Sequence, residues 1–247
     1  MSLLGKKICF GAQKSGGPTA RSYVQAGLIA MWDGIENAGW GVHDAAAKTW
    51  KDLVGNRDLT YTTGTIIHSN NAQNMSYTSS IAYRSGNIPA VTMEFVFKLD
   101  DAQTSASCFI LLNRQNTGRY NGQFCLNYGY FGNLYFETRG NISRCGVPFA
   151  ITDRSVHTVS AAWGNGNGAP ATSGNIDGVS RLVTNLTGTG RDGVDNFIVG
   201  GVAPFQHVYG MKGRIYSIRL YSRALTAAEI AANYAVDKSR FNLPDAT

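Results

Sequence analysis

Short segments of alternating apolar and polar residues recur along most of this chain. In the segment TMEFVFKL, Met93, Phe95 and Phe97 point to one face and Thr92, Glu94 and Lys98 to the other. Such alternation, bounded by turn residues, is typical of β-strands. Further segments of this kind are GLIAMWDG, SCFILLNR, GQFCLNYGY, NLYFETRG, VHTVSAAW, GVSRLVTN and DNFIVGG. With so little helical signal, the pattern predicts an all-β fold of two antiparallel sheets packed face to face.

The pattern changes near the C-terminus. Tyr216, Ile218 and Leu220 form one face of a predicted last strand and Ser217, Arg219 and Tyr221 the other, while Ile215 falls out of phase, which predicts a β-bulge near Tyr216. Thr226 and Glu229 then form a capping box, and Leu225 and Ile230 a hydrophobic staple. We therefore expect a short helix over residues 227–234 that docks across an edge or end of the sandwich as a structural lid.

The length and composition favour one large domain preceded by an arm. A chain of 247 residues, 43% hydrophobic and with 29 glycines, suits a single β-sandwich at residues 25–247. Residues 1–24 show neither period and predict an extended N-terminal arm with four basic side chains: Lys6, Lys7, Lys14 and Arg21. The arm has no apolar stretch of signal-peptide length, and no segment is long and apolar enough to span a membrane. We expect the protein to fold in a cytoplasm and its four scattered cysteines to be free thiols, with a Cys108–Cys125 bridge as the alternative.

The net charge of +6 does not by itself indicate a nucleic-acid-binding protein. Most of that excess lies in the arm, and no basic run follows Arg21, whereas a duplex-binding surface gathers its basic residues on one face. We therefore predict no nucleic-acid partner and no membrane association.

The last strand and the helix after it resemble a known family. Gly213, Ile215, Arg219, Tyr221, Arg223, Ala224, Leu225, Thr226, Glu229 and Ile230 fit the C-terminal signature of laminin-G-like, concanavalin A-like domains. GLIAMWDG and WKDLVGN resemble the opening strand and turn of the same family. The resemblance implies a jelly-roll β-sandwich over roughly residues 26–241, used mostly for binding glycans or proteins and often near a Ca²⁺ ion at the rim. The loop DGIENAGWGVHD also resembles that of standalone gut-bacterial and phage domains of this kind.

Catalytic patterns are missing from the sequence. Laminarinase-type hydrolases of this fold would carry E-x-D-x-E or E-x-D-x-x-E on one strand, because retaining hydrolysis needs two carboxyl groups about 5–5.5 Å apart. No such run occurs, and the four histidines lack zinc-ligand spacing, which indicates ordinary surface or sheet positions. These observations predict that the chain is not an enzyme, with an acid pair assembled from separate loops as the alternative.

Two sets of residues are candidates for binding. Sugars need aromatic faces beside polar groups, and the candidate ligand residues are Trp40, His43, Asp44, Tyr120, Tyr128, Tyr130 and Arg139. Trp40 is the strongest of them, because glycines flank it in a polar loop where burial is least expected. Asp192, Asp195 and Asn196 are either Ca²⁺ ligands or ordinary turn residues, since hard cations bind oxygen-rich loops; no other cofactor is indicated.

These features together predict a non-catalytic recognition module that binds a surface glycan or a host protein. A basic arm without an export signal suggests a phage decoration or fibre protein, released by lysis and docked on capsid or tail proteins through residues 1–24. We expect a homo-oligomer in a virion, with a bacterial cell surface as the alternative location. A glycan-active hydrolase on the same fold and a purely structural subunit are the other two hypotheses.

Overall fold

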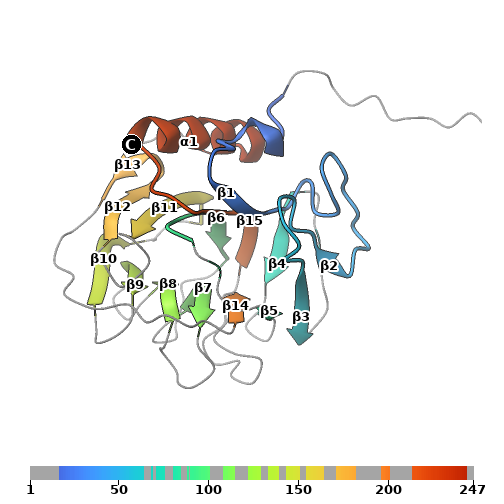
Figure 1. The fold of residues 1–247 in the computed structure, drawn as a ribbon, viewed down its shortest axis with the longest axis horizontal. Helices are drawn as coiled ribbons and strands as arrows, with labels where there is room; N and C mark the ends of the chain where they lie inside the picture. Colours follow the sequence, from blue (N-terminus) through green and yellow to red (C-terminus); the bar gives the residue numbers. More distant parts are fainter. Residues whose placement is uncertain are drawn as a thin grey trace, which may run out of the picture.

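The computed structural model describes a two-sheet sandwich covered on one side by a third layer (Figure 1). The described residues are 17–63, 68, 71–75, 80–84, 88, 90–100, 108–114, 122–128, 133–138, 143–150, 154–163, 171–181, 196–200 and 213–243. Within them, every strand pair is antiparallel, as the alternation predicts.

The first sheet carries the helix. Its strands lie in the order β1 (Leu28–Asp33), β15 (Gly213–Tyr221), β6 (Thr92–Leu99), β11 (His157–Trp163), β12 (Ala171–Ile176) and β13 (Val179–Ser180), and β4 (Gln73–Met75) pairs with the start of β15.

The second sheet lies opposite the first. Its order is β10 (Ser143–Ala150), β9 (Asn133–Thr138), β8 (Gly122–Tyr128), β7 (Cys108–Arg114), β14 (Asn196–Val199), β5 (Ser80–Arg84), β3 (Leu59–Thr63) and β2 (Thr49–Trp50). Cys108 lies opposite Tyr128 and Cys125 opposite Leu112, so the two cysteines are not cross-strand partners.

Apolar side chains from both sheets meet in the space between them. Trp32 of β1 stacks on Phe197 of β14 with ring centroids 5.1 Å apart, which joins the two sheets. Phe95, Phe97 and Ile218 are also fully buried. Burial of aromatic and aliphatic area of this kind is the main stabilising contribution in such a core.

The predicted bulge is confirmed in β15. The register against β6 shifts between Ile215 and Ser217, so Ile215 keeps step with Ile218 and Leu220. Tyr216 was expected on that same face. It instead packs edge-on against Phe241 of the helix, with ring centroids 5.4 Å apart, because the bulge turns it to the other side.

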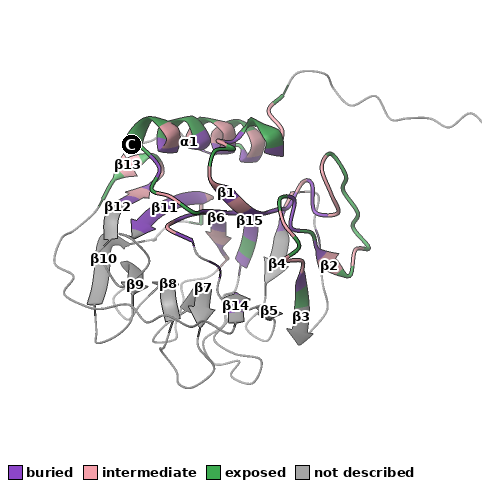
Figure 2. Ribbon diagram, in the orientation of Figure 1, coloured by how far each residue is buried: buried purple, intermediate pink, exposed green. Residues whose placement is uncertain are grey.

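Helix α1 (Ala227–Phe241) lies across the outer face of the first sheet (Figure 1), and its buried side faces the strands (Figure 2). The predicted capping box is present in both directions: Thr226 Oγ1 accepts from the Glu229 backbone N–H, and the Glu229 carboxylate accepts from the Thr226 backbone N–H. A bidentate ion pair with Arg223 lowers the pKa of Glu229 to about 2. The helix runs seven residues beyond the predicted end at Tyr234.

Residues 19–24 belong to the packed structure, although the sequence assigns them to the arm. The 3₁₀ turn η1 (Ala20–Ser22) has Thr19 as its cap, Ala20 is fully buried, and Tyr23 is nearly so. Tyr23 packs with Leu28, Met31, Tyr221 and Ile230 in an outer apolar cluster beneath the helix. The predicted boundary at residue 24 therefore divides a segment that packs as part of the domain, while Lys6, Lys7 and Lys14 lie outside the described residues.

Candidate functional site

The loop of residues 34–48, here called the rim loop, joins β1 to β2 and carries three of the predicted ligand residues. It begins where Asp33 Oδ1 accepts the backbone N–H groups of Ile35 and Glu36, both at 2.9 Å. This local pattern turns the chain out of the strand, because an Asp side chain can accept the backbone N–H groups two and three residues further along. The rim loop lies on the right-hand side of the molecule in Figure 1.

Two buried polar side chains hold the rim loop in shape. Asn37 closes its neck: the amide Nδ2 donates to the carbonyl oxygen of Asp44 at 2.8 Å, and Oδ1 accepts the Asp44 N–H at 2.9 Å. Glu36, only 5% exposed, accepts the Gly41 N–H at 2.7 Å. Gly41 has φ 71°, a left-handed backbone that glycine adopts without strain. The loop is therefore preorganised, which lowers the entropy lost on ligand binding.

Residues 41–46 form the exposed tip of the rim loop. Val42 is 50% exposed, and His43 and Asp44 are exposed beside it. His43 Nδ1 lies 3.0 Å from the carbonyl oxygen of Ile35, so Nδ1 carries the hydrogen and Nε2 is left to accept or, when protonated, to donate. Asp44 Oδ1 accepts the Ala46 N–H at 2.8 Å. The tip thus presents an apolar side chain next to an imidazole and a carboxylate.

Trp40 precedes this tip and lies partly buried, packed against the outer apolar cluster. The guanidinium carbon of Arg21 lies 4.3 Å from the centroid of the Trp40 ring. Trp40 is thus partly core and partly surface, and one face of its ring is covered by an arginine that the sequence placed in the assembly arm.

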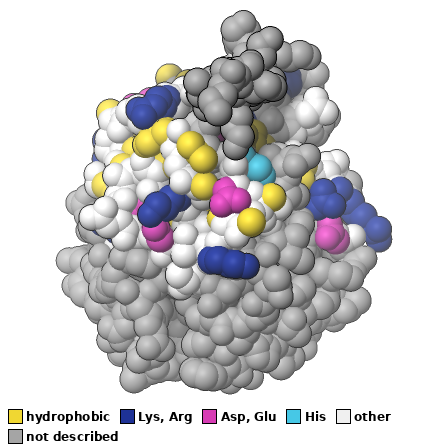
Figure 3. Space-filling model, turned by 90° about the vertical axis from the view of Figure 1, so that its right-hand side faces the viewer, with side chains coloured by type: hydrophobic (Ala, Val, Ile, Leu, Met, Phe, Trp, Pro, Cys, Tyr) yellow, Lys and Arg dark blue, Asp and Glu magenta, His cyan; other side chains and the backbone are white. Residues whose placement is uncertain are grey.

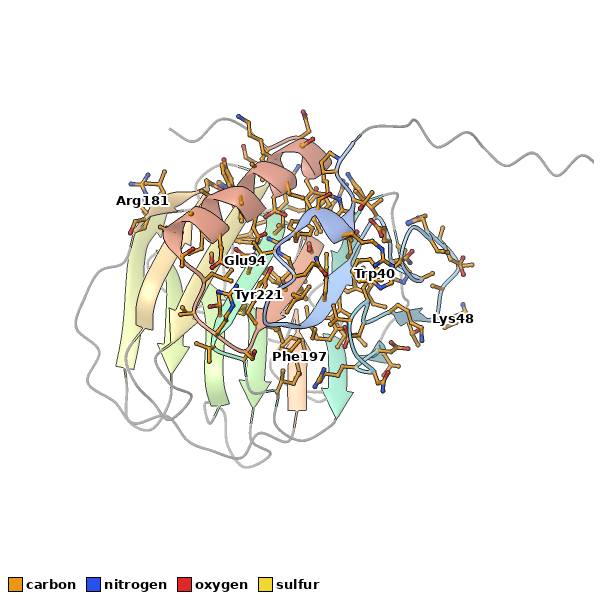
Figure 4. All side chains as sticks on the ribbon, turned by 45° about the horizontal axis from the view of Figure 1, so that its top comes forward. Trp40, Lys48, Glu94, Arg181, Phe197 and Tyr221 are labelled. Carbon is orange, nitrogen blue, oxygen red and sulfur yellow. The ribbon has the colours of Figure 1, made fainter. Side chains whose placement is uncertain are left out.

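The surface that contains the rim loop is chemically mixed. Figure 3, which views this side of the molecule, shows apolar, basic and acidic side chains and a histidine close together. In Figure 4, Trp40 and Lys48 lie on this side, while Arg181 lies on the opposite side of the molecule. Such a mixture suits a ligand with both C–H and hydroxyl groups.

His68 is a residue of this region that the sequence interpretation missed. It is 6% exposed, and within the described part of the chain neither ring nitrogen has a hydrogen-bond partner. Burial lowers the pKa of His68, the nearby His43 lowers it further, and Asp44 raises it. His68 therefore lies close enough to the rim-loop tip to sense its charges. No local signal points to this electrostatic influence, because His43 and His68 are 25 positions apart in the sequence.

The remaining predicted site residues are not brought to the rim loop by the described part of the chain. Tyr120, Tyr130, Arg139, Asp192 and Asp195 lie outside the described residues. The backbone of Tyr128 pairs with Leu134 in β8 and β9, and that of Asn196 begins β14. The Ca²⁺ site stays a prediction, and among the described residues no three His, Cys, Asp or Glu side chains are grouped to hold a metal ion.

Beneath the helix, an ion network ties the rim loop to the rest of the domain. Arg219 of β15 is fully buried: Nε donates to Glu94 at 2.9 Å, and the two Nη atoms donate to Asp237 at 2.7 and 2.6 Å. The Tyr23 hydroxyl donates to Asp237 at 2.7 Å, and its ring lies 4.0 Å from the Arg219 guanidinium. Burial raises the pKa of Glu94, and Arg219 opposes that shift.

Arg240 continues the network toward the rim loop. It donates to both carboxylate oxygens of Asp33, at 2.6 and 2.9 Å, and to Glu36 Oε1 at 3.2 Å. Glu36 in turn accepts the Gly41 N–H. The helix is thus connected through two buried carboxylates to the backbone beside Trp40. This arrangement is structural, as buried charges must be paired.

An antiparallel sandwich with a capped C-terminal helix and a polar, aromatic rim loop defines a lectin-like β-sandwich domain. The family model of the concanavalin A-like lectin/glucanases superfamily (Laminin_G_3) matches residues 70–231, and the chain belongs to this family. The match begins after the rim loop. No curated protein matches the chain in sequence.

Two solved structures illustrate the likeness in fold. Trypanosoma rangeli sialidase, in complex with 2,3-difluorosialic acid as a covalent intermediate, superposes with a TM-score of 0.66 at 13% identity; the match covers 87% of this chain and 33% of the sialidase. Domain 4 of AbnA, a GH43 extracellular arabinanase from Geobacillus stearothermophilus in complex with arabinotriose, has a TM-score of 0.62 at 18% identity, with 85% and 98% covered. The chain spans about a third of the sialidase.

These comparisons contradict the prediction that the chain is not an enzyme, since the sialidase and the arabinanase are glycoside hydrolases. The prediction relied on the absence of two carboxylates at one strand spacing. That absence rules out one arrangement, a carboxylate pair on a single strand, and no other catalytic arrangement. At these identities the likeness itself establishes the fold.

Proposed function

We propose that this chain is a glycan-active domain, which engages a saccharide chain at the rim loop in support of glycoside hydrolysis. The observation that carries the proposal is the match to 98% of an arabinanase domain whose complex contains arabinotriose. The rim loop supports it, since a fixed loop with an exposed apolar tip, an imidazole and a carboxylate offers contacts for both faces of a sugar.

The first test combines binding with cleavage. The intact protein is applied to an array of arabinan, sialylated and uronic-acid glycans, and the same glycans are then assayed for new reducing ends. Binding to at least one glycan class is expected, and release of reducing ends by native but not heat-denatured protein would assign hydrolysis to this chain itself. Neither binding nor release across the panel would contradict the proposal.

The second test locates the site with matched valines. Val42, 50% exposed, lies at the rim-loop tip, whereas Val54, 40% exposed, lies outside the loop. Val42→Ser should weaken glycan binding roughly threefold through lost apolar contact, and Val54→Ser should leave it unchanged. Equal effects of the two substitutions would place the binding surface elsewhere.

The more specific hypothesis of a phage adhesin docked on capsid or tail proteins stays a prediction. It rests on the basic residues of the arm, and the fold is equally compatible with other settings. Among the described residues no helix is long and apolar enough to cross a membrane.

A further inference from the structure

Arg21 and Trp40 form a cation–π pair at the edge of the rim loop. The guanidinium carbon lies 4.3 Å from the ring centroid, Arg21 is exposed, and Trp40 is partly buried. No carboxylate pairs with Arg21 within the described part of the chain. A guanidinium that stacks on an aromatic ring through its face keeps its N–H edge for in-plane acceptors. The pair therefore presents an ordered, unneutralised positive charge to solvent.

One buried carboxylate positions both members of this pair. Glu36 Oε1 accepts the N–H of Ala20, the residue before Arg21, at 2.6 Å. Glu36 Oε2 accepts the N–H of Gly41, the residue after Trp40, at 2.7 Å. Arg240 holds Glu36 in place from the helix, at 3.2 Å. The backbone beside Arg21 and the backbone beside Trp40 are thus held by the same buried side chain, although the two residues are 19 positions apart.

We infer that the Arg21–Trp40 pair is a subsite for the carboxylate of an acidic sugar. This inference rests on the proposed function and names its ligand class. The guanidinium edge matches a carboxylate in bidentate geometry, and the uncovered part of the Trp40 ring offers an apolar surface for the sugar ring.

The exposed carboxylate of Asp44 acts against an anionic ligand at the loop tip. Its Oδ1 is engaged by the Ala46 N–H, and its remaining acceptor capacity suits a sugar hydroxyl. The acidic group is accordingly assigned to Arg21, and the hydroxyls to His43 and Asp44.

Calorimetric titration of the intact protein with paired sugars tests the inference. 3′-Sialyllactose is compared with lactose, and trigalacturonate with its methyl ester, which also distinguishes a sialic from a uronic acid. The wild type should bind the acidic member of at least one pair about tenfold more tightly. This preference should shrink at high ionic strength, since an exposed charge pair is screened by salt.

Arg21→Gln should abolish the acidic preference and leave binding of the neutral sugar unchanged. Lys48→Gln is the matched control, because Lys48 is an exposed cation of the same loop that lies apart from the Trp40 ring (Figure 4). The Lys48→Gln protein should keep the preference for the acidic sugar. Arg21→Lys should retain only part of it, because an ammonium group cannot bind a carboxylate in bidentate fashion. An unchanged unfolding temperature of Arg21→Gln confirms that the fold is intact.

The possible failures are distinguishable. If neutral sugars bind and the acidic members bind no better, or if Arg21→Gln keeps the preference, the inference is overturned while glycan recognition stands. If no sugar of either pair binds and the glycan array is also empty, the proposed function fails and the inference fails with it.

Discussion

Arg219 shows how a polar residue is accommodated in the interior of this domain. It lies between Glu94 and Asp237 with no exposed surface, and its donors are taken by both carboxylates and by Ser217. Desolvating three charges is costly, and the cost is offset only while all partners are present. The sequence places Arg219 on the polar face of the last strand, but no local pattern shows that this face is buried beneath a helix.

Replacing Arg219 by Gln should therefore destabilise the protein by about 3–5 kcal/mol, because two buried carboxylates lose their counter-charge. Arg21→Gln is the control, since an exposed cation–π pair contributes less than about 1 kcal/mol. Urea unfolding followed by tryptophan fluorescence measures both free energies. A loss below that of the control would show that the network contributes little to stability.

His68 should make the stability of the domain depend on mildly acidic pH. Burial and the neighbouring His43 lower its pKa in the folded state, with Asp44 opposing them, so the unfolded chain binds the proton more tightly. The stability present above the unfolded-state pKa of about 6.5 is then lost as the pH falls through the lower, folded-state pKa.

Unfolding free energies of the wild type and of His68→Gln are to be compared from neutral to acidic pH. As the pH is lowered, the unfolding free energy of the wild type should fall more than that of His68→Gln, because Gln does not titrate. Parallel pH profiles for the two proteins would contradict this account of His68.

At the scale of elements, the start of helix α1 was predictable and its end was not. Thr226, Glu229, Leu225 and Ile230 give a strong local start signal, and the structure realises it. In the second half of the helix, Asp237 and Arg240 make buried ion pairs with the sheet. Because both side chains are charged, the sequence pattern there is typical of a solvent-exposed segment. Their partners come from β15, β1 and residue 23, so the information that buries them lies far away in the sequence.

The packing of residues 19–24 against the domain was not predictable for the same reason. Residues 17–24 have no period, and they are held by single long-range contacts: Ala20 to Glu36, Tyr23 to Asp237, and Val24 to Asn233. Glu36 lies in the rim loop, and Asp237 and Asn233 lie in helix α1, so no local sequence pattern around residues 17–24 indicates these contacts.

Two truncations test whether this segment is part of the domain. Removing residues 1–16 leaves every contact described above in place and should leave stability unchanged. Removing residues 1–24 deletes the buried Tyr23 and uncovers Arg219, which should cost at least about 3 kcal/mol, the loss typical of a buried aromatic side chain. Equal stability of the two truncated proteins, measured by urea unfolding, would return residues 17–24 to the arm.

At the scale of the whole molecule, the fold was predictable because alternation reports which face of each strand is buried. Two antiparallel sheets, the bulge near Tyr216 and the docked helix all follow from such local patterns. The rim loop was found through Trp40, whose position between glycines drew notice. The residues that support the loop were not found, since Glu36 and Arg21 act through contacts between residues distant in sequence. Oligomeric state, location and partners stay predictions.

The account's central claim is that glycans bind at the rim loop, and the indole N–H signals of the tryptophans test it most directly. Trp32 Nε1 donates to the Arg57 carbonyl oxygen at 2.9 Å and Trp50 Nε1 to that of Asp33 at 2.8 Å, and both side chains are fully buried. In a two-dimensional ¹⁵N–¹H spectrum, titration with a glycan identified on the array should shift the Trp40 indole signal and leave those of Trp32 and Trp50 in place. A glycan that binds while the Trp40 signal stays unmoved would contradict the claim.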